Sequence, residues 1–294
     1  MTPHVIEPAS PERALLGESP LWSAEEQCLY YVDIGAKQVR RLGGPTWQLQ
    51  SQPGCIALIE GGGLLVATRL GLFKLDPQTG ALQALAEPPY DPAAQRFNDG
   101  KPDANGRLWV GTIDDARQPM AALYRYEKGV FERMAEGITT SNGLSWSPDQ
   151  RTLYWSDTKA HAIYAFDFDP ATGAITGRRV FHAFAPRAAG QSLDDYGGRP
   201  DGATVDAEGC LWVAMYEGRR LLRFSPAGEL LEEFRLPVRC PTMPAFGGTD
   251  MRTLFVTTAC EGRPADELAQ QPWAGQVLQL RVSTEGLAPH KARL

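Results

Sequence analysis

Four oxygen-bearing side chains occupy one position of a repeated sequence pattern and form a candidate binding set for a cation. Six short apolar runs recur along the chain, and Glu18, Asn98, Asn142 and Asp201 lie ten or eleven residues before four of them. Each of these side chains is at a turn that enters a predicted strand. Carboxylate and amide oxygens suit divalent cations such as calcium, magnesium or manganese, and so small a ligand set leaves coordination positions open for water and a substrate.

Turn formation is the alternative explanation for these residues, because Asn and Asp are common at turns without binding any ligand. Glu18 is a poor turn former, and the coincidence across several repeats favours a shared role. We therefore predict that Glu18, Asn142 and Asp201 hold one divalent ion. In the two other repeats the same spacing selects residues without a side-chain oxygen, namely Pro53 or Gly54 and Met243 or Pro244.

Arg96 and Asn98, in the segment QRFNDGKPD, are predicted to belong to the same rim and to bind a substrate. A guanidinium group offers five fixed donors and keeps its charge, which suits the oxygens of a polyol or a sugar acid, and an amide both donates and accepts. The alternative is that Arg96 merely pairs with Asp99 or Asp103 on a turn. The position of Asn98 in the repeat favours the binding role.

Other polar residues give weaker signals. Asp114 and Asp115 follow an apolar run and are predicted to form a solvated acidic turn, with a place at the rim as the alternative. The histidines show neither metal-ligand spacing nor a serine or cysteine partner, so a Ser-His-Asp mechanism is not predicted; they are His4, His161, His182 and His290.

The apolar runs themselves predict the fold that positions these groups. They begin at intervals of 35 to 58 residues, and about 40 to 50 residues build one four-stranded blade of a β-propeller. We predict an all-β, six-bladed propeller formed by one domain, residues 1–294, in which equivalent positions share a ring around the central channel. The tryptophans of the runs are predicted to pack between blades. The runs span residues 29–33, 64–68, 108–112, 153–157, 211–215 and 254–258.

Three further segments have expected places in this propeller. The longest interval holds the polar, glycine-rich segment 186–198, which is expected to overhang the rim as a lid, with a plain surface connection as the alternative. A helical turn is expected within 265–271. The residues before Gly17 are expected to pair with the C-terminal blade, because such closure removes an open sheet edge.

Composition narrows the possible partners. A net charge of -6 without clustered basic residues argues against nucleic acid, and no stretch is long and apolar enough to span a membrane. The start of the sequence lacks the features of a signal peptide. Five cysteines without a C-x-x-C pair predict neither disulfides nor a zinc knuckle. We expect a cytoplasmic protein that is a monomer or a weak homo-oligomer.

Several motifs together resemble the gluconolactonase and regucalcin-like (senescence marker protein) family of six-bladed propellers. The resemblance implies that Glu18, Asn142 and Asp201 hold a single divalent ion and that Arg96 and Asn98 bind substrate hydroxyls. It also implies hydrolysis of a sugar-acid lactone, while leaving open the sugar and the metal, which is calcium, zinc, manganese or iron(II). The motifs are GESPLW, RFNDGKPDANGRLWVGT, SNGLSWSPD, PDGATVDAEGCLWVA and AFGGTDMRTLFVTTA.

The predicted chemistry is polarisation of the lactone carbonyl by the ion, with Arg96 and Asn98 orienting the ring. Either Asp201 takes the proton from the attacking water, or the ion lowers the pKa of that water enough to supply hydroxide directly. Three other functions are compatible with a propeller: a calcium-binding regulatory protein without catalysis, a hydrolase of phosphotriesters or aryl esters, and a protein-interaction module.

Overall fold

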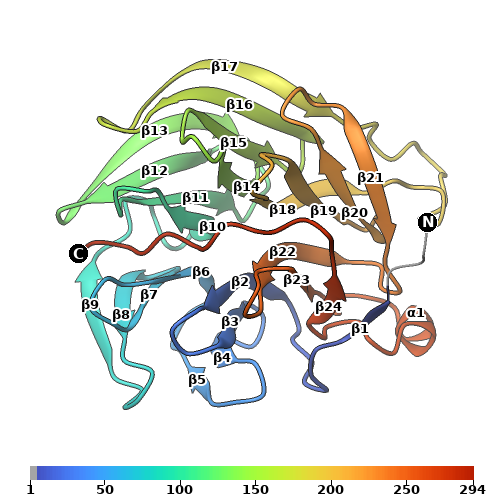
Figure 1. Cartoon of the computed structure of the whole chain (residues 1–294), viewed down its shortest axis with the longest axis horizontal. Coiled ribbons are helices and arrows are strands. Elements are labelled where there is room, and N and C mark those ends of the chain that lie inside the picture. The colour runs from blue at the N-terminus through green and yellow to red at the C-terminus, as the bar shows by residue number, and fades with distance from the viewer. Residues whose placement is uncertain (1–4) are drawn as a thin grey trace.

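The computed structural model describes residues 5–294, which form six four-stranded antiparallel sheets arranged around a central axis (Figure 1). The predicted six-bladed, all-β propeller is therefore confirmed. Residues 1–4, which include His4 and the start of the predicted domain 1–294, lie outside the described residues.

Blades 1 to 3 follow the order of the chain, each running from an inner to an outer strand. Blade 1 comprises β2 (Gly17–Ser23), β3 (Cys28–Asp33), β4 (Gln38–Arg41) and β5 (Thr46–Gln48). Blade 2 comprises β6 (Pro53–Leu58), β7 (Leu64–Thr68), β8 (Gly71–Leu75) and β9 (Leu82–Ala86). Blade 3 comprises β10 (Gln95–Pro102), β11 (Leu108–Asp114), β12 (Ala121–Glu127) and β13 (Val130–Ile138).

Blades 4 to 6 complete the ring. Blade 4 comprises β14 (Ser141–Trp146), β15 (Thr152–Asp157), β16 (Ala162–Asp169) and β17 (Ala174–Ala183). Blade 5 comprises β18 (Arg199–Val205), β19 (Leu211–Tyr216), β20 (Arg220–Phe224) and β21 (Leu230–Arg235). Blade 6 comprises β22 (Pro241–Gly247), β23 (Thr253–Thr258), β24 (Leu278–Arg281) and, from the N-terminal segment, β1 (Ile6–Pro8).

Closure of the ring follows the prediction for the N-terminal segment. β1 pairs antiparallel with β24, with Ile6 opposite Leu280, so strands from both regions of the chain share blade 6. The pairing covers one edge of β24 that would otherwise offer unpaired backbone groups. The expected helical turn is also present, as α1 (Ala265–Gln270).

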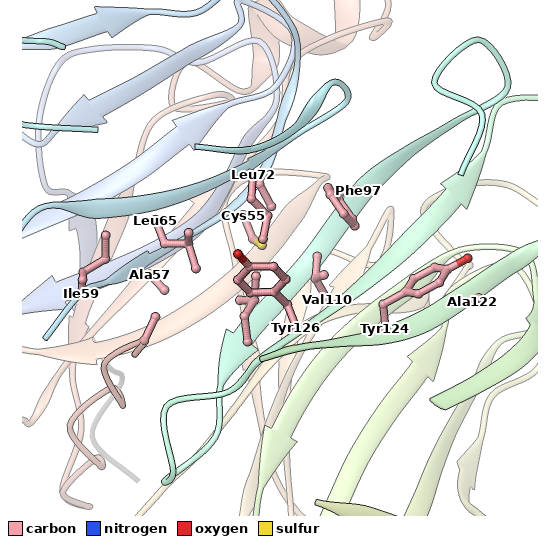
Figure 2. Packing of buried hydrophobic residues seen from close by; sticks show 13 residues of the cluster. Cys55, Ala57, Ile59, Leu65, Leu72, Phe97, Val110, Ala122, Tyr124 and Tyr126 are labelled. Atoms are coloured by element: carbon pink, nitrogen blue, oxygen red, sulfur yellow. The ribbon is translucent and has the colours of Figure 1, made fainter. Parts of the chain in front are cut away.

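The six apolar runs are the second strands of the blades, and they supply much of the packing between neighbouring sheets. Trp109, Trp155 and Trp212 are 0%, 0% and 1% exposed, which confirms that they are core residues. Figure 2 shows the cluster between blades 2 and 3, where Leu65 from β7 and Tyr126 from β12 belong to one buried group. Burying a large apolar side chain contributes about 1.5–3 kcal/mol, so each blade is stabilised by its neighbours.

A β-bulge interrupts the pairing of every inner strand with its second strand. In β2 the register shifts between Glu18 and Leu21, and in β14 it shifts between Asn142 and Ser145. A bulge leaves residues unpaired and turns their neighbours, so it can redirect side chains out of the sheet. Gly143 accommodates the bulge of β14, because its φ is +62° and a Cβ there would lie 2.6 Å from the Ser156 hydroxyl.

The bulges show that the four residues predicted to share one ring occupy two different positions in their strands. Glu18 and Asn142 stand directly before their bulges, whereas Asn98 and Asp201 are the first residues within theirs. In blade 6 the shift falls between Pro241 and Met243, so the bulge residue is Thr242 and not Met243 or Pro244 as the spacing indicated.

The C-terminal tail covers the channel end opposite these bulges. Inner strands run from the bulges toward a cavity of about 100 Å³ that is lined by Leu21, Ser145 and Val205, and also by Leu287 and His290 of the C-terminal tail. The tail crosses this end of the channel (Figure 1), and Ala292 forms a parallel bridge with Ile59 of blade 2. No helix within residues 5–294 is long and apolar enough to cross a bilayer.

Buried aspartates at hairpin turns secure the core tryptophans. Asp206 Oδ2 accepts hydrogen bonds from the Trp212 indole at 2.8 Å and from Arg223 Nε at 2.9 Å. Asp103 makes the equivalent bonds to Trp109, at 2.9 Å, and to its own neighbouring arginine. These carboxylates satisfy indole N–H groups that would otherwise be buried without a partner.

Replacing Asp206 with alanine is expected to destabilise the protein by about 2–4 kcal/mol, because the Trp212 indole and the Arg223 Nε group lose their buried acceptor, while Arg223 keeps its pairs with Glu208 and Glu232. Urea unfolding measures the effect. Glu208→Ala is the matched control, since Glu208 is mostly exposed and pairs with the same arginine, and it should cost less than about 1 kcal/mol. Equal losses for the two variants would contradict this account.

Candidate functional site

The five residues predicted for the site line one cavity of about 250 Å³ at the end of the channel where the bulges lie. β2, β14 and β18 deliver Glu18, Asn142 and Asp201, and β10 delivers Arg96 and Asn98. The bulges place these groups at the channel rather than in the regular alternation of each strand. Four different blades thus contribute to one site.

A chain of hydrogen bonds joins four of the five side chains. Arg96 donates to Asn98 Oδ1 at 2.7 Å, and Asn98 Nδ2 donates to Asn142 Oδ1 at 2.8 Å. Asn142 Nδ2 donates to Asp201 Oδ1 at 2.6 Å and to the Thr158 hydroxyl at 2.8 Å. Asn98 also donates to a backbone carbonyl, so both hydrogens of its Nδ2 are used by protein partners.

The orientation of the Asn142 amide bears on the predicted ligand set. Its nitrogen, and not its oxygen, faces Asp201 in the structure, whereas a cation requires the oxygen. A 180° turn exchanges the two atoms with almost no change of shape, and the choice depends on the surrounding hydrogen bonds. The Thr158 hydroxyl can donate or accept, so it is compatible with either orientation, but a turned amide would bring Asn142 Nδ2 against Asn98 Nδ2. Ligation of an ion beside Asp201 by the Asn142 oxygen would therefore require the bond from Asn98 to be given up.

Two buried carboxyl groups in the site lack a charged partner at hydrogen-bonding distance. Glu18 is 8% exposed and accepts only from the backbone N–H of Ser19 among the described residues. Burial, together with repulsion from Asp201 and Asp99, raises the pKa of Glu18 well above its usual value. Burial also raises the pKa of Asp201 to about 8, with a further contribution from Asp99.

Asp99 adds a third buried carboxyl group next to these two. Its Oδ2 accepts from the backbone N–H of Leu144 at 3.0 Å, while its Oδ1 has no hydrogen-bond partner within residues 5–294. Lys101 is the nearest compensating charge, but its ammonium group donates to the Ala203 carbonyl and to Ser145. Desolvation lowers the pKa of Lys101.

This donor set fits a divalent cation. Glu18 and Asp201 offer carboxylate oxygens, Asn142 offers an amide oxygen, and two buried carboxylates without a cation are costly to ionise. No histidine or cysteine lines the cavity among the described residues, so the chemistry of the ligands favours calcium, magnesium or manganese over softer ions.

The metal-free protein is expected to lose stability as the pH rises. Asp201 is ionised above about pH 4 in the unfolded chain but takes up a proton below about pH 8 when folded, so its contribution is present at low pH and lost as the pH passes 8. Glu18 shifts in the same direction. Urea unfolding with a chelator should show a fall on the order of a few kcal/mol between about pH 5 and pH 8.5.

Asp201→Asn provides the control for that measurement, because it removes one titrating group and should flatten the metal-free profile. Saturating divalent metal should stabilise the wild type more at the higher pH, since metal and protons compete for the same oxygens. A metal-free stability that rises with pH across this range would contradict the expected burial of the two carboxyl groups.

The structure distinguishes the two alternatives for Arg96. Arg96 forms no ion pair with Asp99 or Asp103 among the described residues; its guanidinium donates to Asn98 and to the Phe97 carbonyl. Asp103 is instead paired with Arg107. Burial and the neighbouring charges of Arg117 and Arg69 lower the pKa of Arg96 to about 10, so it stays charged at neutral pH. The simple turn pair is therefore wrong.

The expected solvated acidic turn is wrong for Asp114, which is buried at the end of β11, and holds for Asp115, which is exposed in the turn that follows. Asp114 is 6% exposed and accepts from the backbone N–H of Gln118 at 2.9 Å. Asp115 is more exposed and forms a two-pronged ion pair with Arg69, at 2.9 and 3.0 Å. Neither aspartate lines the cavity.

Segment 186–198 does not contribute to the lining of the cavity, so the expected lid has no support in its contacts. Arg239 fixes the segment by donating to the Leu193 carbonyl at 2.8 Å and to Asp194 at 2.6 Å. Tyr196 is buried, and its hydroxyl lies 2.5 Å from His161 Nε2. The segment is a surface connection held by side-chain contacts.

Several lining residues were missed by the sequence reasoning. Arg117, Lys159, Arg199 and Tyr216 all line the cavity. Arg199 is the first residue of the segment RPDG, two positions before Asp201, and it stacks on Tyr216, with 5.1 Å from guanidinium carbon to ring centroid. Arg117 and Lys159 lie in loops that follow the second strands of blades 3 and 4, and the repeat carries no signal that distinguishes such loop residues.

A second acidic cluster lies at the far end of blade 5. Asp206, Glu208 and Cys210 bring their ligand atoms close together. Arg223 donates to Asp206 and to Glu208, at 2.9 and 2.6 Å, and thus supplies the positive charge that a metal would bring. We therefore interpret this cluster as an ion-pair network.

Known proteins are similar to the chain over most of its length. Residues 16–260 match the family model described as SMP-30/Gluconolactonase/LRE-like region. The 6-deoxy-6-sulfogluconolactonase of Pseudomonas putida is 42% identical, over 94% of each chain. Human regucalcin is 33% identical, over 97% of each chain. A solved structure described as a calcium-binding protein, regucalcin, from Agrobacterium tumefaciens superposes with a TM-score of 0.92 at 27% identity, covering 99% of this chain and 98% of the other.

The family model over residues 16–260 and the two relatives, at 42% and 33% identity over nearly their whole length, agree with the motifs that first indicated the resemblance. The chain belongs to the SMP-30/gluconolactonase/LRE-like family, a family that includes sugar lactonases.

Proposed function

We propose that this protein hydrolyses a sugar-acid lactone to the free aldonic acid with the help of one divalent metal ion. The proposal rests on the observation that Glu18, Asn142 and Asp201 line the same cavity as Arg96 and Asn98. The name of the Pseudomonas putida relative, a sulfogluconolactonase, supports a lactone as substrate. An ion-binding group beside a polyol-binding group is what lactone hydrolysis requires.

Glu18, Asn142 and Asp201 would hold the ion. When bound, a divalent cation supplies Lewis-acid polarisation of a carbonyl and lowers the pKa of water. Calcium is supported by the description of the Agrobacterium tumefaciens protein, and the all-oxygen donor set also suits manganese or magnesium. Zinc and iron(II) remain part of the test, because three oxygen ligands do not exclude them.

The residues of the chain bind and orient the lactone. Arg96 carries a fixed positive charge at the cavity and has donor groups beyond those used on Asn98 and Phe97. Asn98 holds Asn142 in place through its nitrogen, and its Oδ1, which accepts only from Arg96, can also accept from a substrate hydroxyl. Fixing the ring hydroxyls in this way aligns the carbonyl for attack, which lowers the entropic part of the barrier.

Asp201 is the proposed general base. Its Oδ1 accepts from Asn142, which leaves Oδ2 without a hydrogen-bond partner among the described residues and available to take a proton from the attacking water. A general base in reach of the water contributes about a hundredfold to ten-thousandfold to the rate.

Turnover of the metal-stripped protein tests the proposal. Hydrolysis of a panel of aldonolactones, followed by proton release, should be absent with a chelator and return when calcium, manganese, magnesium, zinc or iron(II) is added. Activity that is unaffected by thorough metal removal would overturn the role of the ion. Metal binding without turnover of any lactone would instead support a calcium-binding regulatory protein, the second candidate, which the description of the Agrobacterium tumefaciens protein favours.

We also propose that the protein works in a reducing compartment such as the cytoplasm. All five cysteines are free and four of them are buried, as expected for small apolar core residues that are not oxidised.

A further inference from the structure

Two cationic side chains at the mouth of the cavity have no protein partner. Arg117 and Lys159 both line the cavity and are exposed. Within residues 5–294, neither the Arg117 guanidinium nor the Lys159 ammonium group forms a hydrogen bond or an ion pair; only their backbone groups are bonded. Most other arginines around them are paired with an acid, so these two stand out.

Two neighbouring arginines at this rim have acidic partners that balance their charge. Arg199 pairs with Glu217 at 3.1 Å, and Arg69 holds Asp115 in a two-pronged ion pair. Glu217 and Asp115 are therefore already paired with cations other than Arg117 and Lys159. Arg117 approaches Asp115 closely enough to affect its pKa, but the hydrogen bonds of Asp115 go to Arg69.

The charges that face the substrate space add up to an excess of positive charge. Glu18 and Asp201 carry the negative charges of the cavity, and a bound divalent ion would balance them. Arg96 contacts an amide and a carbonyl and no carboxylate, so its charge is also uncompensated. The whole chain has a net charge of -6, so this local excess of positive charge is not the result of a basic protein overall.

We propose that the lactone taken by this site carries an anionic substituent, a carboxylate, phosphate or sulfonate, which Arg117 and Lys159 bind while the carbonyl faces Glu18, Asn142 and Asp201. This inference rests on the proposed lactonase function and names the substrate class of the same site. All three substituents offer several oxygens to a guanidinium and an ammonium group.

The positions of the two cations suit this role. Arg117 follows β11 of blade 3 and Lys159 follows β15 of blade 4, and the bridge between Ile113 and Thr140 joins these neighbouring blades directly at the cavity. Both cations therefore lie on the side of the cavity formed by blades 3 and 4. Asn142, a member of the ion-binding set, belongs to the same blade as Lys159, and the ion-binding set and both cations line the same cavity.

The test compares kcat/KM for gluconolactone with kcat/KM for its derivatives that bear a phosphate, sulfonate or carboxylate at the carbon farthest from the carbonyl. The wild type should prefer at least one charged lactone, and the preference should weaken at high salt. Arg117→Gln and Lys159→Gln should each lower kcat/KM for that lactone by about tenfold, and by more when combined, with little change for gluconolactone.

Lys128→Gln is the matched control. Lys128 is exposed on a hairpin turn and, like Arg117, has a left-handed backbone conformation, with φ of 49° against 59°. It should leave every rate unchanged. Equal use of neutral and charged lactones, or variants that keep the wild-type preference, would overturn the anion site while leaving the lactonase proposal intact.

Calorimetry separates failure of the two proposals, because it does not depend on turnover. Metal-loaded protein should bind at least one of phosphogluconate, sulfogluconate and glucarate about tenfold more tightly than gluconate, and the combined variant should bind all four acids alike. If the protein shows this binding preference but turns over no lactone, the lactonase function would be overturned and the anion site would stand. Equal binding of all four acids by the wild type would overturn the anion site on its own.

Discussion

Asp201→Asn is expected to lower kcat for lactone hydrolysis by about a hundredfold to ten-thousandfold, because it removes the proposed general base. The substitution keeps the size of the side chain and one oxygen, so the fold and part of the metal site should persist. The partner of Asp201 Oδ1 is the amide of Asn142 at 2.6 Å, which can turn to suit a neutral neighbour. Steady-state kinetics at saturating metal measure the effect.

Metal binding has to be measured beside activity for this variant. Calorimetric titration should show that Asp201→Asn still takes up the ion, with weakened affinity, so the kinetic loss is read only at metal concentrations that saturate it. Asp195→Asn is the matched control, because Asp195 is exposed in segment 186–198 and does not line the cavity. A variant that binds metal and keeps full turnover would show that Asp201 is not the base.

Glu18→Gln should act on metal affinity and much less on the chemical step. Glu18 contributes a buried carboxylate whose only hydrogen-bond donor among the described residues is the backbone of Ser19, so its charge is available to a cation. Changing a residue that only hydrogen-bonds a metal ligand already costs metal affinity about tenfold to a hundredfold, and loss of a charged ligand should cost at least about a hundredfold. The metal concentration at half-maximal activity is the quantity to measure.

Rescue by excess metal distinguishes a ligand from a base at this position. With enough metal, Glu18→Gln should regain most of the wild-type kcat, whereas Asp201→Asn should not. A Glu18→Gln enzyme that is saturated with metal and still inactive would assign a catalytic role to Glu18 and would contradict the division of labour proposed here.

Much of the fold can be predicted from the sequence, because every blade must bury the apolar side chains of its second strand against a neighbouring blade. Runs such as 108–112 and 211–215 place tryptophan in the second strand of a sheet, and a four-stranded sheet buries such side chains only against a neighbouring blade. Six runs therefore predict six blades. The open edge of the last blade predicts pairing with the N-terminal segment, as β1 and β24 show.

The spacing of the repeats along the chain predicts only part of the candidate site. Counting back from the runs selects Glu18, Asn98, Asn142 and Asp201, and all four reach one cavity because the blades share an axis. The count does not show that two of them precede a bulge and two lie within one. Bulges depend on how neighbouring inner strands pack, as at Gly54, where a Cβ would lie 2.4 Å from the Phe97 carbonyl.

The sequence by itself determined the number of blades, their closure and the oxygen-bearing side chains that reach the cavity, since these depend on periodic burial and on residue type. Only the tertiary structure decided that Asn98 donates to Asn142, that Asp115 is engaged by Arg69, and that Arg117 and Lys159 line the cavity without a side-chain partner within residues 5–294. Contacts between side chains on loops of different blades depend on distances in space, and no local pattern along the chain carries that information.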